Sequence, residues 1–214
     1  LAVINPSRPD CSSGLTDLAG VGVAFYLVIA LRQHLRKTNF WDNLPEPNLK
    51  NLCDLVAIGT IADIVPLTGV NRILVKTGLD LLNVNARPGI AALKTVTKFT
   101  QPEWTAEDVA FKLAPRLNAP GRIDHARVAL SLLINDDPEG AQKTADTLNK
   151  LNAKRQFIEQ DIADDIIRII GPDKKISQQQ KSLVLARPGW HQGVIGIAAS
   201  RAVRRYGLPV ALIA

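Results

Sequence analysis

The chain has 214 residues, of which 46% are hydrophobic, so it is long and apolar enough to fold as one large or two smaller globular domains. No apolar run approaches the roughly 20 residues that span a bilayer, and the first residues lack the features of a signal peptide, so we expect a cytoplasmic protein with no membrane partner. The formal net charge is +6, and bases gather in residues 112–127 and 187–205, which is compatible with a polyanionic partner.

The first half of the chain has the apolar periodicity of helices separated by turns. Residues 2–5 are typical of the end of a strand, and residues 7–14 of a loop. The long apolar run at 15–37, with its basic end, predicts a buried helix. After a proline-marked loop, the pattern predicts further helices at 49–65, 71–83, 88–98, 106–117 (behind a capping pattern of Thr105 and Asp108) and 125–135.

The longest predicted helix covers residues 138–170. Asp137 is a suitable N-cap, Pro138 suits the first turn, and Gly171-Pro172 is a helix stop. At 1.5 Å per residue such a helix is roughly 50 Å long. A helix of this length, followed by the polar tract at 174–182, is typical of a connector between domains.

The C-terminal part has the order strand, loop, helix, strand, with strands expected at 182–186 and 210–214. We expect the backbone N–H groups of Gly193 to Gly196 to be free at the helix N-terminus, where they favour an anion. Trp190 and His191 stand at the mouth of this loop, and Ser200 and Arg201 follow within about two turns. The alternative is structural, with Trp190 covering a core and His191 capping the loop.

Two further motifs each have a functional and a structural interpretation. Asp63 is the only charged residue between Leu55 and Leu67, so we expect a buried carboxylate. It is then a backbone-satisfied cap or a ligand of a hard cation. Asp54 is the weaker metal candidate, because an acid at a helix N-terminus is explained by the dipole alone. Asn118 and Arg122, separated by a flexible turn, suit a phosphate, or they mark an ordinary helix end.

Four stretches, LAGVGVAFYL, DLVAIGTIADIVPL, RLNAPGR and GWHQGVIGIAASR, resemble in order and spacing the RecJ-type single-stranded-DNA exonucleases of the DHH phosphoesterase superfamily. The resemblance implies an α/β fold of three parts. Residues 1–136 are the mostly helical C-terminal part of a DHH phosphoesterase domain, 137–172 a long connector helix, and 173–214 the start of a DHH-associated substrate-binding domain. The chain lacks a methionine and stops in a strand-like run, so we expect an internal fragment.

The resemblance also implies an activity and a set of site residues. The family uses Mn²⁺ or Mg²⁺ to hydrolyse single-stranded DNA from the 5′ end, in repair and recombination. Asp63 corresponds to a catalytic metal ligand, and Trp190 could stack on a base. The residues implied to contact substrate phosphates are Asn118, Arg122, His191, Gly193, Gly196, Ser200 and Arg201. Single-strand-binding protein and a helicase are the implied protein partners.

The chain also departs from the family pattern. The DxD, isolated-aspartate and DHH motifs that supply most metal ligands do not occur in it, so we expect this chain alone to be inactive. Pro120 stands where a small residue is expected. Two alternatives remain: a small-molecule or short-oligonucleotide phosphodiesterase of the same superfamily, and a non-catalytic DNA-binding relative.

Overall fold

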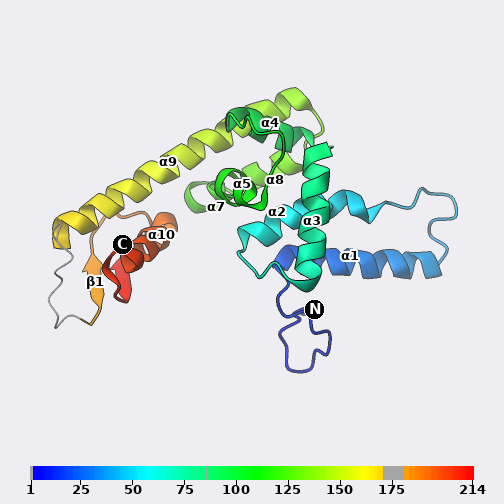
Figure 1. The fold of residues 1–214 in the computed structure, drawn as a ribbon, viewed down its shortest axis with the longest axis horizontal. Helices are drawn as coiled ribbons and strands as arrows, with labels where there is room; N and C mark the ends of the chain where they lie inside the picture. The colour runs from blue at the N-terminus through cyan, green and yellow to red at the C-terminus, as the bar shows by residue number, and fades with distance from the viewer. Residues whose placement is uncertain (1, 85, 171–180) are drawn as a thin grey trace. The chain divides into compact units, whose positions relative to one another are not determined.

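The computed structural model describes residues 2–84, 86–170 and 181–214, and it is mostly helical with one small sheet (Figure 1). Contacts divide the chain into two compact units, Leu1–Pro115 and Arg116–Ala214. Each unit has its own buried side chains. No helix in the described ranges is both long enough and apolar enough to cross a membrane.

The first unit consists of helices and loops. Its elements are α1 (Gly20–Lys37), the 3₁₀ turn η1 (Leu49–Leu52), α2 (Cys53–Ala62), α3 (Gly69–Val84), α4 (Pro88–Val96), α5 (Ala106–Asp108) and the π-helical turn η2 (Val109–Leu113). α6 (Ala114–Asn118) continues η2 across the boundary between the units. The predicted helices are confirmed, and so is the capping box of Thr105 and Asp108.

Helix α2 is the centre of the first unit, because α1 and α3 both pack against it at glycines. A Cβ atom at Gly78 of α3 would lie 2.1 Å from the carbonyl oxygen of Cys53, and one at Gly59 would lie 2.7 Å from a methyl carbon of Val21 in α1. Such distances leave no room for a side chain. The close packing fixes the direction of α2 and therefore the place of Asp63 at its C-terminal end.

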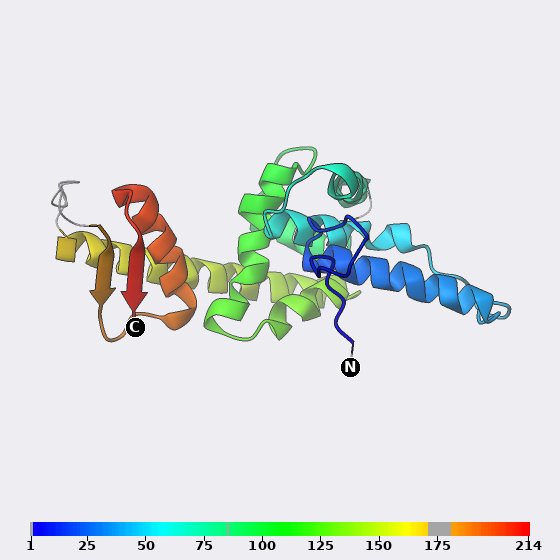
Figure 2. The same cartoon turned by 90° about the horizontal axis from the view of Figure 1, so that it is seen from below.

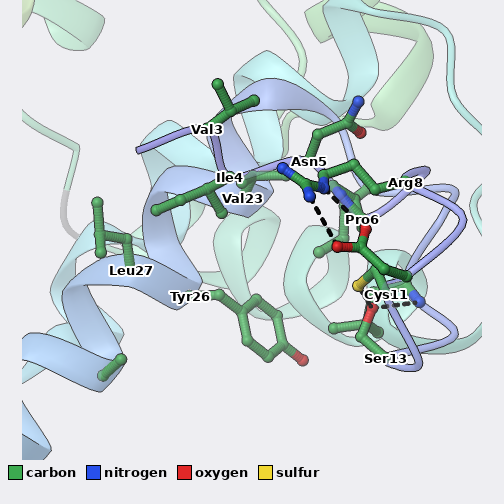
Figure 3. A pocket seen from close by; sticks show the side chains of 14 residues that line it. Val3, Ile4, Asn5, Pro6, Arg8, Cys11, Ser13, Val23, Tyr26 and Leu27 are labelled. Atoms are coloured by element: carbon green, nitrogen blue, oxygen red, sulfur yellow. Dashed lines mark hydrogen bonds and ion pairs between the residues drawn. The ribbon is translucent and has the colours of Figure 1, made fainter. Parts of the chain in front are cut away.

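Two predictions for the N-terminal region are wrong. Residues 2–5 form no strand, and only Gly22 and Phe25 of α1 are buried, whereas Leu27 and Leu31 are 51% and 52% exposed. Apolar residues occur on every side of α1, and α2 covers only one of those sides. Side chains from the segment 3–13 and from α1 line a pocket of about 530 Å³. The ion pair of Arg8 and Asp10 belongs to that lining, which is drawn in Figure 3.

The second unit combines helices with two parallel strands. Its elements are α7 (Pro120–Ile123), α8 (Arg127–Ile134), α9 (Pro138–Ile170), β1 (Leu183–Ala186), α10 (Gln192–Tyr206) and β2 (Val210–Ile213). β1 and β2 run in the same direction with Leu183 opposite Val210 (Figure 2). The predicted strand–loop–helix–strand order is confirmed. α7 stands where the sequence left open a phosphate-binding turn or an ordinary helix end.

The long helix α9 is continuous from Pro138 to Ile170, as predicted. Asp137 caps it, since its carboxylate accepts hydrogen bonds from the backbone N–H groups of Gly140 at 2.8 Å and Glu139 at 3.2 Å. The helix stop expected at Gly171-Pro172, and the polar tract from 174 to 180, lie outside the described residues.

The core of the second unit lies where α10 packs on α9 and on the sheet. Ile162 and Ile166 of α9 meet Trp190 and a row of small α10 side chains, and the sheet contributes Leu185, Val210 and Leu212. This packing fixes the N-terminus of α10 and the loop before it.

Candidate functional site

The two motifs that were expected to bind phosphate meet in the second unit, although Gly193 lies 71 positions after Arg122. α7 packs against α10 so closely that a Cβ atom at Gly193 would lie 1.9 Å from the carbonyl oxygen of Arg122. The Arg122 guanidinium donates a long hydrogen bond of 3.4 Å to the carbonyl oxygen of Gly193. Gly193 is therefore needed for packing, and it places exposed Arg122 beside the start of α10.

His191 is the N-cap of α10. Its Nδ1 accepts a hydrogen bond of 3.1 Å from the backbone N–H of Gly193, and its carbonyl oxygen accepts bonds from Val194 and Ile195. The expectation that the N–H groups of 193–196 are free is therefore wrong for 193, 194 and 195. Because Nδ1 accepts, the ring proton lies on Nε2, which is the nitrogen that can donate to a ligand. The capping alternative is correct and still leaves His191 a donor.

Gly196, Ser200 and Arg201 lie on exposed parts of α10. A Cβ atom at Gly196 would meet nothing within 4 Å, so no packing contact requires this glycine. Ser200 donates its hydroxyl proton to the carbonyl oxygen of Gly196 at 3.0 Å. The Arg201 guanidinium donates to Oε1 of Gln160 in α9 at 3.0 Å, and its side chain is 54% exposed. These groups keep polar atoms open to solvent.

Trp190 belongs to the core and not to an open surface. The residue is 6% exposed, and its indole N–H donates a hydrogen bond of 3.2 Å to Oδ2 of Asp165. A ring buried among Ile162, Ile166 and Val194 presents little face to a base. The structure therefore favours the alternative in which Trp190 covers a core over stacking on a base.

Asp165 is a polar residue that the sequence interpretation missed. Its side chain is buried in α9, and it receives ion pairs from Arg187 and, at 3.0 Å, from Arg168. A signal was present, because Asp165 falls between Ile162, Ile166 and Ile169 on the apolar stripe of the helix. An acid in such a stripe requires partners when it is buried.

Asp63 differs from the expectation in burial. It is exposed at the C-cap of α2, and no hydrogen bond or ion pair joins its carboxylate to another described residue. The buried acid of this helix is Asp54, 4% exposed, whose carboxylate accepts a bond of 2.6 Å from Nε of Arg87. The partner of Asp54 explains its burial, whereas Asp63 stands where the helix dipole disfavours an anion.

The structure offers no complete metal centre within the ranges it describes, because no three His, Cys, Asp or Glu side chains there gather to hold an ion. An exposed carboxylate such as that of Asp63 can supply one oxygen ligand to a hard cation. The remaining ligands would have to come from other residues.

The basic residues at 112–127 do not form one free patch. Lys112 pairs with Asp108 at 2.7 Å, and Arg116 donates to Asn149 at 2.9 Å. Burial lowers the pKa of Arg116. Arg122 and Asn118 are exposed, Asn118 at the end of α6 and Arg122 in α7. Both remain candidate phosphate contacts, and Arg127 at the start of α8 is exposed as well.

No family model matches the chain. The curated proteins that it resembles are named single-stranded-DNA-specific exonuclease RecJ. It is 43% identical to the protein of Salmonella typhimurium over 213 residues, which are 98% of the chain and 37% of that protein. It is 42% identical to the Escherichia coli protein over 216 residues, with the same shares. Nearly the whole chain is thus similar to one region of these RecJ proteins.

Solved RecJ structures agree with this assignment. A RecJ exonuclease bound to manganese matches with a TM-score of 0.77 and 37% identity, over 94% of this chain and 48% of that one. The RecJ of Thermus thermophilus in complex with Mg²⁺ matches with a TM-score of 0.75 and 39% identity, over 95% and 30%. The chain spans a little over a third of the length of the first curated relatives that it matches.

Proposed function

We propose that this RecJ-type region is part of a metal-dependent exonuclease that hydrolyses phosphodiester bonds of single-stranded DNA from the 5′ end. The similarity to RecJ proteins along 98% of the chain is the observation that carries the proposal. The meeting of the Arg122 motif with the N-terminus of α10 supports a phosphate-binding role for the second unit.

Asp63 is the proposed metal ligand of this region. Its carboxylate is exposed, forms no bond with another described residue, and is an oxygen donor of the kind that Mn²⁺ and Mg²⁺ accept. RecJ structures with either ion support the same choice of cation. Such ions, when bound, supply positive charge that activates water and stabilises the leaving oxygen.

The residues around the start of α10 are the proposed phosphate contacts. Nε2 of His191 and the guanidinium groups of Arg122 and Arg201 can donate hydrogen bonds to phosphate oxygens. Asn118 adds a neutral donor, and Ser200 can donate to a phosphate if its hydroxyl proton turns away from the carbonyl oxygen of Gly196. The bare surface at Gly196 lets a phosphate approach the helix. Gly193 acts indirectly, by allowing the close contact that positions Arg122.

We also propose the domain assignment of the sequence analysis: the end of a DHH phosphoesterase domain at 1–136, a connector at 137–172, and the start of a DHH-associated domain at 173–214. A role in repair and recombination and a cytoplasmic location belong to the same proposal. Single-strand-binding protein and a helicase stay predicted partners.

The experiment separates chemistry from binding. In a RecJ protein of full length that carries this region, Asp63→Asn should lower single-turnover cleavage of 5′-labelled single strands by orders of magnitude, with affinity near wild type. Arg201→Ala should weaken affinity roughly ten- to hundred-fold, because it removes one charge-assisted phosphate contact. Asp80→Asn, an exposed acid of α3, is the matched control. Normal cleavage by Asp63→Asn would refute the metal-ligand assignment.

The same measurements address the alternatives. The 214-residue chain alone should release no nucleotides with Mn²⁺, because one carboxylate cannot hold the catalytic metals. Preferred turnover of cyclic dinucleotides over oligonucleotides by the longer protein would favour the small-molecule phosphodiesterase. Binding without any cleavage in that protein would favour the non-catalytic relative.

A further inference from the structure

We propose that Arg168 and Arg187, held together by the buried carboxylate of Asp165, form an additional anion site that takes a backbone phosphate of the bound strand. The site lies in the second unit, on α9 and on the loop between β1 and α10. It rests on the proposed function for the identity of its ligand.

The carboxylate of Asp165 is fully engaged. Oδ1 pairs with Nη1 of Arg168 at 3.0 Å and with Nη1 of Arg187, and Oδ2 accepts the indole N–H of Trp190 at 3.2 Å. The side chain of Asp165 is only 7% exposed. A buried carboxylate with three donors holds its partners in fixed positions, since releasing any of them would leave buried charge less well paired.

The two arginines have guanidinium N–H groups that do not pair with Asp165. Both pair with the same oxygen through one nitrogen each, and their side chains are 67% and 44% exposed for Arg168 and Arg187. A guanidinium has five N–H donors, so most of them remain available to a ligand. Two cations against one carboxylate leave the cluster with a charge of +1, and a phosphate would neutralise it.

The position of the cluster suits a strand that passes the proposed phosphate contacts. Arg187 begins the loop that leads through Trp190 to His191, the N-cap of α10. The hydrogen bond from Trp190 to Asp165 ties this loop to α9, where Arg168 lies. One continuous loop therefore presents Arg187 and His191, and a polyanion in contact with both is the ligand that this arrangement favours.

The test measures binding of a 5′-fluorescent oligothymidylate to the 214-residue chain by anisotropy, across a salt series. Arg168→Gln and Arg187→Gln should each lower the affinity about three- to ten-fold and make the salt dependence shallower by roughly 0.7 unit, as expected for one lost contact to a single strand. Arg204→Gln, an exposed arginine in the last turn of α10, should behave as wild type. Circular dichroism confirms that each variant is folded.

Asp165→Asn distinguishes a built site from a merely basic surface. Removing a negative charge should strengthen DNA binding if only net charge matters. If Asp165 positions the arginines, the variant should bind the strand more weakly than wild type despite its higher positive charge. Tighter binding by a folded Asp165→Asn would overturn the proposal.

The remaining outcomes separate this site from the proposed function. If the wild-type chain binds no oligonucleotide, the proposed function itself fails for this region and the site fails with it. If Arg201→Ala weakens binding while both glutamine variants match wild type, only the arginine site is refuted. Inorganic phosphate is titrated in parallel. If it binds at the arginines in the chain, but the oligonucleotide affinity does not depend on them, the strand assignment is wrong.

Discussion

Two glycines of one motif have different roles, although both occur in the stretch GWHQGVIGI. Gly193 faces the carbonyl oxygen of Arg122, where a methyl group cannot fit, whereas the surface at Gly196 is open. The first glycine is required by packing between α7 and α10. The second is free of packing constraints, so any need for it must come from a ligand.

Alanine substitutions should separate these roles. Gly193→Ala should cost roughly 1 to 3 kcal/mol of unfolding free energy, because the backbone of α7 or α10 has to move. Gly196→Ala should be neutral or stabilising by up to about 1 kcal/mol, since alanine favours a helix. Urea denaturation measures the stability, and oligonucleotide anisotropy the affinity. Equal stability of the two variants would contradict the packing argument, and weaker DNA binding by stable Gly196→Ala would support a phosphate there.

The aspartates at the two ends of α2 show what a sequence pattern can predict about a single residue and what it cannot. An isolated acid in an apolar run was expected to be buried, yet Asp63 is exposed and Asp54 is buried. The difference depends on Arg87, which lies 33 residues after Asp54 and pairs with it. Periodicity describes one helix at a time, so a partner brought in by tertiary packing could not be predicted. The same holds for Asp165 and its two arginines.

Elements with strong local end signals were predicted best. The bounds of α9 agree with the prediction because Asp137 and Pro138 define its start chemically. The π-helical turn η2 and the short helix α7 were not predicted, since neither has a signal that separates it from an ordinary helix or its end. The exposure of α1 was also missed, because it depends on how much protein surrounds that helix.

The capping box at the start of α5 leads to a prediction about how stability changes with pH. The hydrogen bond from Lys112, and then that from Thr105, lowers the pKa of the Asp108 carboxyl. The charged carboxylate therefore stabilises the fold above its unfolded pKa of about 3.9, and this stabilisation is lost as the pH falls through the lower folded value. Asp108→Ala should cost roughly 1 kcal/mol at about pH 7 and less near pH 2.

Thermal unfolding of wild type and Asp108→Ala at the two pH values measures that difference. Glu107→Ala is the matched control, because Glu107 is an exposed acid of the same turn. The two variants should differ at neutral pH and converge in acid. A constant difference between wild type and Asp108→Ala at both pH values would show that the charge of Asp108 has no part in stability.

At the scale of the whole molecule, the structure divides after Pro115, whereas the resemblance suggested a domain boundary at 136. The division after Pro115 follows the contacts within the structure, whereas the boundary at 136 follows the resemblance to a family. Contacts group α9 with α7, α8 and α10, because its apolar stripe is buried against them. A sequence reveals that stripe but not the elements that cover it, so the partners of the long helix could not be predicted.

The division leads to a prediction about where DNA is bound. A protein of residues 116–214 should bind single-stranded oligonucleotides, with an affinity that falls as salt is raised, because it contains Arg122, His191, Arg201 and the Asp165 cluster. Residues 1–115 should bind much more weakly. Anisotropy with the same labelled oligonucleotide compares the two proteins. Stronger binding by residues 1–115 would show that the main phosphate contacts lie in the first unit, and the assignment to the second unit would be wrong.

The open edges of the two-stranded sheet affect how this chain behaves in concentrated solution. Within the described ranges β1 pairs only with β2, so the outer edge of each strand has backbone groups that no strand covers. Val184 and Ile213 on these strands are 63% and 53% exposed. Open edges with apolar side chains are templates for pairing between molecules. Protein concentration during storage should therefore decide whether molecules associate. Dilute samples should stay monodisperse longest, and concentrated samples should associate through this sheet before they unfold.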